Sequence, residues 1–230
     1  MGLVKEKGVY IFEEFLDFGI LAGFTDRTFP GLMVEDDLKA ISSSLDFTYQ
    51  NLHYLNQVHG NSVIYPKGNT RIYTADGLIS DKKRQVLIVR TADCIPVFFY
   101  DSLRSVSGII HLGWKPAKEN ILNEFIDKAT EDLKVNLNES FIGIGPGLRK
   151  CCFEVKEEFL SFSCFSDFIE KRNSRYFLDM VAFLKKTFID RGLLRDNFLD
   201  SQICTICNKE FYSYRRDKTQ NRTISFIIQR

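Results

Sequence analysis

Three short apolar runs in the middle of the chain constrain its fold more than any other feature. Residues 86–89, 95–100 and 106–110 are rich in β-branched and aromatic side chains, and short polar or Asp-containing connections separate them. This composition is typical of β-strands. The runs therefore predict neighbouring strands in the core of the protein.

Helices are predicted mainly after these strands. In residues 120–133, apolar side chains recur at helical spacing with charged residues between them, which indicates an amphipathic helix. A second helix is expected to begin near Glu154. A third is expected over residues 178–191, with Gly192 at the position of a C-terminal cap. The class is therefore mixed α and β with a substantial sheet.

The remaining segments are mostly β-rich. Short alternation over residues 9–24 predicts a hairpin, and residues 141–144 predict a strand that ends in a Gly-Pro-Gly turn. Residues 201–205 and 223–229 are also β-rich, and the polar segment 212–222 between them is expected to form a loop.

The bulk properties predict one independent globular domain. The 230 residues contain no linker-like stretch, so we expect residues 1–230 to form a single domain. The net charge of +1 gives no electrostatic reason to bind nucleic acid or an anionic membrane. No apolar run approaches the roughly 20 residues of a membrane helix, and no export signal is evident. A cytoplasmic location is expected, with the six cysteines as reduced thiols.

Two of the three histidines and one cysteine stand where predicted strands begin or end. His59 precedes one predicted strand, Cys94 lies at the junction of two, and His111 closes the next. Two imidazoles and one thiolate can hold a zinc ion with its fourth position open, an arrangement typical of catalytic zinc. Such an ion lowers the pKa of a bound water to about 7 and polarises an oxygen or leaving group.

Two other interpretations of the same residues remain open at this point. From spacing alone, a histidine or cysteine in a β-rich core is more often a satisfied core residue than a ligand. Alternatively, Cys94 is a nucleophile that His111 activates as a base, without any metal. The spacing does not separate these readings.

Other polar groups give weaker signals. Asp76 with Gly77 is typical of a turn, and it is also a candidate carboxylate for the site. Arg27, Arg215 and Arg216 are candidate oxyanion ligands, because guanidinium groups bind oxyanions bidentately. Trp114 stacks on a planar ligand or covers the core.

The cysteines outside this site are interpreted as thiols. Cys204 and Cys207 have the spacing of half a zinc site or of a redox pair. The other half would have to come from Cys151 and Cys152, whose adjacency is awkward for tetrahedral ligation. We therefore favour buried, unligated thiols.

Six motifs follow one another along the chain. They are Asn56-Gln57-Val58-His59-Gly60; Ala75-Asp76-Gly77-Leu78; Thr91-Ala92-Asp93-Cys94; His111-Leu112-Gly113-Trp114; Ile144-Gly145-Pro146-Gly147 with Cys152-Phe153-Glu154-Val155; and Phe211-Tyr212-Ser213-Tyr214-Arg215-Arg216-Asp217. In this order they resemble the laccase-domain family over about residues 20–228. Members were first described as multicopper polyphenol oxidases. They are now understood as purine nucleoside phosphorylases that also deaminate adenosine and cleave methylthioadenosine.

The resemblance implies a fold, a metal and a set of substrates. The fold is a single-domain α/β/β/α sandwich, and zinc is held at the positions of His59, Cys94 and His111. The substrates are purine nucleosides and phosphate, and the resemblance names no protein partner.

It also implies roles for neighbouring residues. Arg27, Arg215 and Arg216 are the expected phosphate or ribose ligands, and Gln57 is a polar contact of the substrate. Asp76 is the candidate proton relay for deamination. The sequence departs from the family at Phe29-Pro30, where glycines are usual, and at Lys115-Pro116, where Arg-Gly is usual. A lysine keeps the charge but loses the planar fork, which puts the anion site in question.

The older oxidase activity is a poor match to the composition. A laccase holds four copper ions and needs far more imidazoles than three. One copper could still bind adventitiously, because nitrogen-rich sites favour Cu²⁺ over Zn²⁺. Two further alternatives are a metal-free Cys/His hydrolase, by analogy with a deamidating toxin domain of the same fold, and a non-catalytic binding protein.

Overall fold

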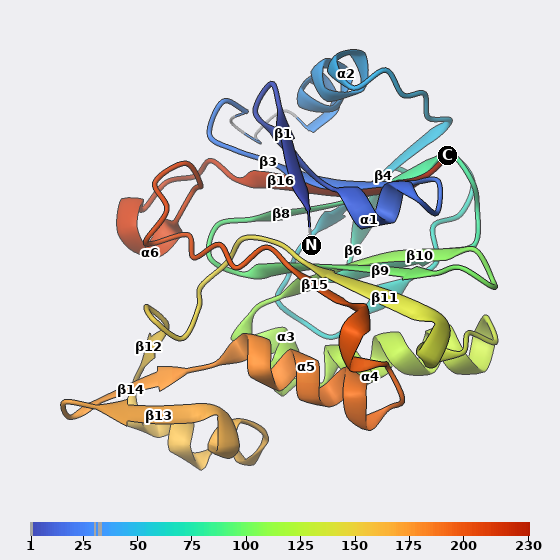
Figure 1. The fold of residues 1–230 in the computed structure, drawn as a ribbon. Helices are drawn as coiled ribbons and strands as arrows, with labels where there is room; N and C mark the ends of the chain where they lie inside the picture. Colours follow the sequence, from blue (N-terminus) through green and yellow to red (C-terminus); the bar gives the residue numbers. More distant parts are fainter. Residues whose placement is uncertain (1, 30, 32–33) are drawn as a thin grey trace.

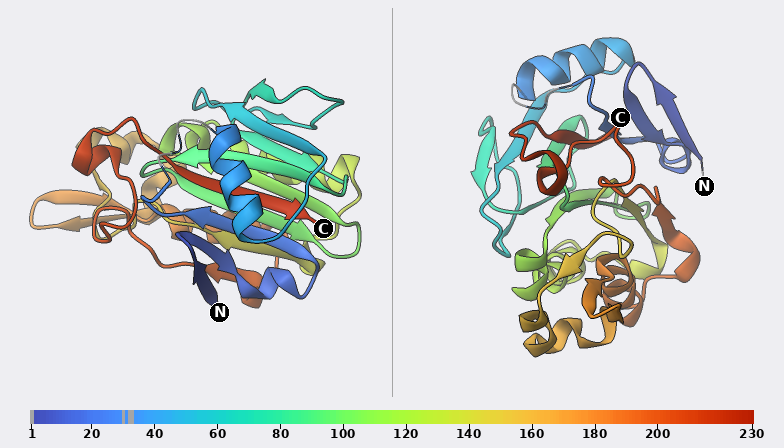
Figure 2. Two further views of the ribbon diagram at one scale, coloured as in Figure 1. Left: turned by 90° about the horizontal axis from the view of Figure 1, so that it is seen from above. Right: turned by 90° about the vertical axis from the view of Figure 1, so that its left-hand side faces the viewer.

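The computed structural model describes residues 2–29, 31 and 34–230. Two large β-sheets pack face to face, with one helix outside the first sheet and three outside the second (Figure 1). The right-hand view of Figure 2 shows these layers from the side, with α2 at the top and the helices of the second sheet at the bottom, and the left-hand view looks down on α2 and the first sheet. The architecture is the expected α/β/β/α sandwich. In the described part of the chain, no helix has the length and apolar character needed to cross a lipid bilayer.

The first sheet has seven strands, in the spatial order β1-β2-β3-β16-β8-β4-β6. Their bounds are β1 Leu3–Glu6, β2 Val9–Phe12, β3 Ile20–Thr25, β16 Thr223–Gln229, β8 Gln85–Thr91, β4 Asn51–Asn56 and β6 Ile72–Thr74. The pairs β4–β8 and β4–β6 are parallel, and the other neighbours are antiparallel.

The second sheet has six strands, in the order β15-β11-β9-β10-β7-β5. Their bounds are β15 Phe198–Asp200, β11 Ser140–Ile144, β9 Ile95–Asp101, β10 Val106–Leu112, β7 Gly77–Ser80 and β5 Val63–Ile64. A small third sheet contains β12 Glu154–Val155, β14 Arg175–Leu178 and β13 Ile169–Arg172.

Helices cover the two outer faces of the sandwich (Figure 1). α2 (Val34–Ser44) lies on the first sheet, and α3 (Trp114–Lys118), α4 (Ile121–Asp127) and α5 (Met180–Asp190) lie on the second. Two single-turn helices, α1 (Glu13–Leu16) and α6 (Tyr214–Asp217), belong to connections.

Alternate side chains of each central strand enter different apolar layers. In β9, Phe98 packs between the sheets, whereas Val97 and Phe99 face α4 and α5. In β8, Leu87 packs between the sheets and Val86 faces α2. Because both faces of β8 and β9 are buried, neither strand has a face that contacts water. Their sequences are therefore continuously apolar rather than alternately apolar and polar.

Most of the predicted elements are confirmed. The hairpin over residues 9–24 is the antiparallel pair β2–β3, joined through α1. The helix over residues 120–133 is α4, which continues into a π-helical turn at Lys128–Asp132. β11, α5 and β16 lie where the sequence placed them, and Gly192 has a φ of +107° after α5.

Three expectations are wrong. β8 lies in the first sheet, whereas β9 and β10 pair in the second, so the three apolar runs are not neighbours in one sheet. No α-helix begins near Glu154. β12 is followed there by two 3₁₀ turns, Glu157–Ser161 and Ser163–Phe168. Phe159 and Phe165 are buried in these turns, but the apolar side chains do not recur at the spacing of an α-helix. The strand near residue 201 is β15, which ends at Asp200.

Candidate active site

Cys94 lies where the chain crosses from one sheet to the other. β8 ends at Thr91 in the first sheet and β9 begins at Ile95 in the second, at the side of the molecule where α6 lies (Figure 1). Asp93 has a φ of +92° at this crossing, and its backbone oxygen accepts a hydrogen bond of 2.7 Å from Leu148 N. The crossing therefore presents the Cys94 thiol from a fixed backbone.

His111 is held near Cys94 by a buried carboxylate. It is in β10 and is 3% exposed, and its Nδ1 lies 2.7 Å from Oδ1 of Asp76, which is fully buried. Since Nδ1 is used by this contact, Nε2 is the nitrogen left for a metal or for a reacting group. A carboxylate behind a histidine is the usual support of a metal ligand.

The same carboxylate fixes the loop that carries His59. Its two oxygens accept backbone N–H bonds from Val58 (3.3 Å), His59 (3.1 Å) and Gly60 (2.7 Å). His59 has a φ of +60°, in the left-handed region. A residue other than glycine rarely adopts this conformation unless surrounding contacts hold it there. Asp76 thus positions both histidines.

The three side chains predicted as ligands converge. The ligand atoms of His59, Cys94 and His111 all lie within 4.8 Å of one another, and the centroids of the two imidazole rings are 4.8 Å apart. Two imidazoles and one thiolate match the donor set that catalytic zinc takes in proteins. The cluster is a possible metal-binding site, and its residues fit zinc.

The electrostatics of the cluster favour a thiolate. Burial opposes ionisation of the Cys94 thiol, but the charge of His111 and hydrogen bonds from His111 and His59 outweigh it and lower the pKa of Cys94 to about 6. Burial likewise opposes protonation of His111, but Cys94 and Asp76 outweigh it and raise the His111 pKa to about 9. A thiolate is the form that both a metal ligand and a nucleophile require.

A pocket of about 850 Å³ opens beside the cluster. Its described lining includes the three cluster residues together with Trp114, Phe153 and Met180 as apolar walls and Gln57, Arg90, Arg215, Lys218 and Arg222 as polar groups. Four of these polar side chains are cationic, so the pocket is suited to an anionic ligand.

Gln57 and Arg215 line the pocket, as the sequence led us to expect. The Gln57 amide is used in both directions: Oε1 accepts from Arg90 N at 2.8 Å, and Nε2 donates to Arg90 O at 2.9 Å. Arg215 donates through Nη1 to Glu154 O at 2.7 Å, and its guanidinium lies 5.3 Å from the Phe153 ring centroid. Gln57 therefore holds the end of β8, and Arg215 closes one side of the pocket.

Arg27 and Arg216 are not among the described residues that line this pocket. The Arg216 guanidinium donates to the carbonyls of Thr205 and Phe211 and pairs with Asp217 at 2.7 Å, so it braces the loop from within. Arg27 Nη2 lies 3.6 Å from Asp217 Oδ2, and the Arg27 guanidinium lies over the Tyr212 ring. Both guanidinium groups are used in structural contacts, which isolated sequence positions did not reveal.

Arg90 and Arg222 were missed by the sequence analysis. Arg90 Nε is buried and has no hydrogen-bond partner in the part of the chain that the structure describes. The pKa of Arg222 is lowered by burial and then by the nearby charge of Arg90. Two guanidinium groups that lie close enough to repel each other are suited to bind an anion between them, and only the fold brings them together.

The family departures at positions 115 and 116 lie beside the pocket. Lys115 places its ammonium 5.6 Å from the Trp114 ring and is not among the described lining residues, and Pro116 is buried in α3. Pro30 lies outside the described residues.

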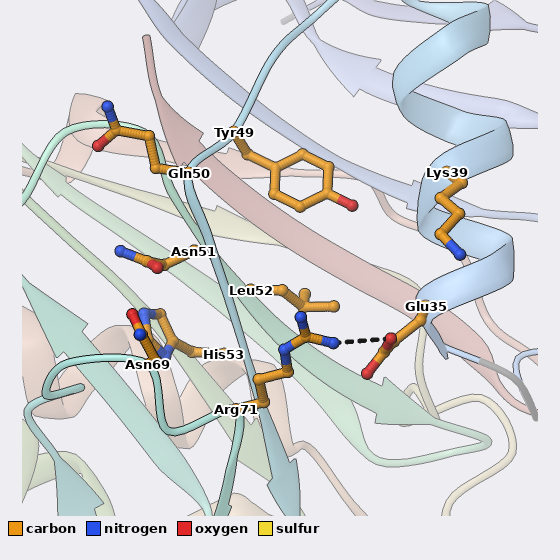
Figure 3. A pocket seen from close by; sticks show the side chains of 9 residues that line it. All are labelled: Glu35, Lys39, Tyr49, Gln50, Asn51, Leu52, His53, Asn69 and Arg71. Atoms are coloured by element: carbon orange, nitrogen blue, oxygen red, sulfur yellow. Dashed lines mark hydrogen bonds and ion pairs between the residues drawn. The ribbon is translucent and has the colours of Figure 1, made fainter.

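A second pocket of about 380 Å³ lies elsewhere, between α2 and β4 (Figure 3). Its side chains include Glu35, paired with Arg71 at 2.8 Å, and His53, whose Nδ1 lies 2.8 Å from Thr70 O. The third histidine of the chain, His53, therefore lies apart from the cluster of His59, Cys94 and His111.

A family model described as multi-copper polyphenol oxidoreductase laccase matches residues 31–230. The chain belongs to this laccase family. The family expected from the six motifs is thereby confirmed.

Proteins similar to this laccase-family chain carry a different functional name. A protein of Clostridium acetobutylicum named purine nucleoside phosphorylase is 32% identical over 189 residues, which cover 80% of this chain and 79% of that relative. One of Campylobacter jejuni with the same name is 34% identical over 180 residues, covering 76% and 75%.

Solved structures share the fold of this chain. The Bacillus licheniformis protein YfiH has a TM-score of 0.88 at 22% identity, with 99% of both chains covered. YlmD of Geobacillus stearothermophilus has a TM-score of 0.87 at 20% identity, with 99% of this chain and 98% of that chain covered. At these identities the likeness concerns the fold.

Proposed function

We propose that residues 1–230 form one laccase-type domain that acts as a zinc-dependent purine nucleoside phosphorylase. The relatives with this name, at about one-third identity, support a nucleoside-processing enzyme that uses purine nucleosides and phosphate. The observation that carries the proposal is one pocket that joins the cluster of His59, Cys94 and His111 to the arginines Arg90, Arg215 and Arg222. A phosphorolytic enzyme needs both an anion site and a group that stabilises the leaving base.

His59, Cys94 and His111 would hold the zinc ion. When bound, zinc supplies Lewis acidity that polarises an oxygen or nitrogen and lowers the pKa of water. Asp76 then acts through its neighbours: it keeps the proton on His111 Nδ1 and fixes the backbone of His59. We assign it a positioning role, and any proton that it relays would have to pass through the His111 ring.

Phosphate would be bound by the arginines of the pocket. Arg90 Nε has no hydrogen-bond partner among the described residues, and Arg222 lies close by with its Nη1 donating to the carbonyls of Thr219 (2.9 Å) and Asn221 (2.8 Å). The remaining N–H groups of these two arginines would bind one phosphate, and Arg215 would close over it. A phosphate oxygen then attacks the anomeric carbon of the ribose while the bond to the purine nitrogen breaks. The purine leaves with the electron pair and takes up a proton, which yields the free base and ribose 1-phosphate.

The same pocket would serve the two side activities that the family resemblance implies. Its volume of about 850 Å³ is within the range of small-molecule sites, and Trp114 and Phe153 offer flat apolar surfaces to a purine. Methylthioadenosine differs from adenosine at the ribose 5′ position and would be cleaved by the same attack. Adenosine deamination requires water in place of phosphate, with attack at the carbon that bears the amino group.

A metal-free cysteine hydrolase is the second candidate. It is favoured by the Cys94 pKa of about 6, because a thiolate next to a protonated His111 is the arrangement of an activated nucleophile. In that case Cys94 attacks the substrate directly. Copper bound at the same cluster, with weak laccase-like oxidation of polyphenols, is the remaining alternative, and we expect it to be adventitious.

Product analysis tests the proposal. Zinc-loaded wild-type protein is incubated with inosine, adenosine or methylthioadenosine, with and without inorganic phosphate. We expect free base only when phosphate is present, with ribose 1-phosphate formed from inosine and adenosine and 5-methylthioribose 1-phosphate from methylthioadenosine. Ammonium should form from adenosine under both conditions. Free ribose formed at the same rate without phosphate would contradict phosphorolysis and support a hydrolase.

A matched pair of variants tests the anion site. Arg90→Ala should raise the KM for phosphate by about tenfold or more, because a charged hydrogen bond contributes about 1.5–3 kcal/mol. Arg71→Ala, in the second pocket, is the control and should leave this KM unchanged. Equal effects of the two variants on the KM for phosphate would show that Arg90 does not bind phosphate.

A further inference from the structure

Four of the remaining cysteines form a second cluster, away from His59 and His111. The sulfur atoms of Cys151, Cys152, Cys204 and Cys207 all lie within 4.8 Å of one another. Two come from the turn after β11 and two from the segment after β15, which the chain order separates by about fifty residues. The sequence predicted buried, unligated thiols. Only Cys204 is buried, whereas Cys151 and Cys207 are exposed, so the predicted burial is wrong for these two.

The spacing of the sulfur atoms suits a metal better than a disulfide. With Zn–S bonds of about 2.3 Å, neighbouring sulfurs of a tetrahedral site are about 3.8 Å apart. Cys207 Sγ lies 3.9 Å from Cys151 Sγ and 3.4 Å from Cys152 Sγ, so one sulfur has two neighbours near this distance. A disulfide brings only two sulfurs to about 2.05 Å and leaves the others without a role.

The surroundings of Cys204 also resemble a metal site. Burial opposes ionisation of its thiol, but the nearby backbone N–H groups of Cys207, Arg149 and Ile206 outweigh burial and lower the pKa of Cys204. Groups of this kind around a sulfur also support the ligands of bound metals. Cys204 is buried and Cys151 and Cys207 are exposed, so a metal can enter from solvent and then be enclosed on one side.

We infer that Cys151, Cys152, Cys204 and Cys207 bind a structural zinc ion through four thiolates. Four sulfur ligands leave no open position, so this ion would take no part in the reaction. Its binding releases the thiol protons and forms four Zn–S bonds, with no change in oxidation state.

The site would cross-link two segments that build the substrate pocket. Gly147 pairs with Cys204 as an isolated bridge, through hydrogen bonds from Gly147 N to Ile203 O (3.2 Å) and from Thr205 N to Gly147 O (3.1 Å). The first segment leads to Phe153 and the second leads to Arg215, both of which line the pocket. Thr205 Oγ1 also donates to Asp93, next to Cys94, at 2.7 Å. Zinc here would hold one wall of the pocket in register with the catalytic cluster.

Metal analysis in a Cys94→Ser background tests this site independently of the proposed catalytic zinc. Proteins are purified under reducing conditions from cells supplied with zinc. We expect Cys94→Ser to retain about one zinc per chain, as one Cys₄ site predicts. Adding Cys207→Ser should remove it, whereas adding Cys164→Ser should not, because Cys164 is a half-buried cysteine outside both clusters.

Cobalt substitution supplies a second measurement that needs no change in the Cys₄ cluster. Cobalt-loaded Cys94→Ser protein should show strong thiolate-to-cobalt charge-transfer absorption of a tetrahedral site. The inference is overturned if Cys94→Ser holds no zinc and shows no such band. It is equally overturned if Cys207→Ser retains the zinc, if iron is found instead, or if the four cysteines prove to be paired as disulfides.

Discussion

At the scale of single residues, the buried carboxylate Asp76 connects the two histidines of the cluster. One oxygen meets His111 Nδ1, and both accept backbone N–H groups of the loop that carries His59. The hydrogen bonds to these donors outweigh burial and keep the pKa of Asp76 below its usual value. The side chain is therefore ionised at neutral pH and acts as a fixed acceptor.

Asp76→Asn tests this assignment. The amide has one acceptor oxygen in place of two and brings N–H donors that face other donors, so both histidines lose their support. We expect zinc affinity to fall by about 10–100-fold, as is typical when a carboxylate behind a ligand histidine is altered. Isothermal titration with zinc measures this, together with the rate of adenosine deamination. Wild-type affinity and a wild-type rate would show that Asp76 has no role at the site.

Gly113→Ala probes the space around the thiol. A Cβ at Gly113 would lie 2.9 Å from Cys94 Sγ and 3.6 Å from the His59 ring, although its φ of −94° and ψ of 173° are allowed for alanine. The variant should fold normally and lose zinc affinity by about tenfold or more, within the range seen when the surroundings of a ligand change.

Gly60→Ala is the matched control for this substitution. Its Cβ would meet nothing closer than 3.8 Å, although Gly60 belongs to the same loop as His59. Equal zinc affinities of the two variants would indicate that crowding at Cys94 does not matter.

The sequence identified the residues of the cluster better than the arginines around it. His59, Cys94 and His111 stand out in the sequence because histidine is rare in this chain and each of the three lies at or near the end of a predicted strand. The sequence did not separate the arginines that line the pocket from those that do not. Arg215 lines the pocket, but the neighbouring Arg216 donates to backbone carbonyls instead. The single helical turn of α6 decides which of these two adjacent side chains faces the pocket. The residue types alone do not predict this orientation.

At the scale of elements, β4, which lies next to the edge strand β6 of the first sheet, contains a titratable group with a direct effect on stability. His53 in β4 is fully buried, and burial lowers its pKa below the ordinary 6.5 despite a hydrogen bond with Thr70 O. The unfolded chain therefore binds a proton at a higher pH than the folded protein does.

This difference predicts a pH dependence of the free energy of unfolding. As pH falls below about 6.5, the His53 contribution should decrease by up to about 1.4 kcal/mol per pH unit, and it should level off below the folded pKa. His53→Gln can keep a bond to Thr70 O but does not titrate, so its unfolding energy should fall less steeply than that of the wild type. Urea unfolding at pH 7.5, 6.5 and 5.5 compares the two slopes. Equal slopes would contradict the account.

Helices and strands were predictable where buried apolar residues recur at regular spacing or form short continuous runs in the sequence. α4, α5, β9, β10 and β16 have clear apolar patterns, and their positions match the expectations. The division of β8 and β9 between two sheets was not predictable, because both strands are apolar on both faces and a short connection serves equally for a hairpin or a crossing. That crossing is what places Cys94 at the site.

At the scale of the whole molecule, stability depends on the aromatic layer between the sheets. Phe98 is fully buried there, and its ring meets Phe12 of the other sheet edge-on, with centroids 5.4 Å apart. The layer holds together the two sheets that the chain crosses at Cys94.

Phe98→Ala should lower the free energy of unfolding by about 3–5 kcal/mol, because it removes a ring from a filled core. Leu103→Ala is the control: Leu103 is 68% exposed, and we expect a change within about 0.5 kcal/mol. Denaturant unfolding measures both variants. Similar small losses in the two would mean that the sheets are held together elsewhere.

The most direct test of the central claim is zinc content measured beside phosphate-dependent turnover of inosine and adenosine, for wild type and Cys94→Ala. We predict that Cys94→Ala contains about one zinc per chain less than the wild type, as loss of one ligand set implies, and that base release is lost with it. A wild-type protein with no zinc at this cluster and full activity that still depends on Cys94 would contradict the zinc assignment and establish Cys94 as a nucleophile.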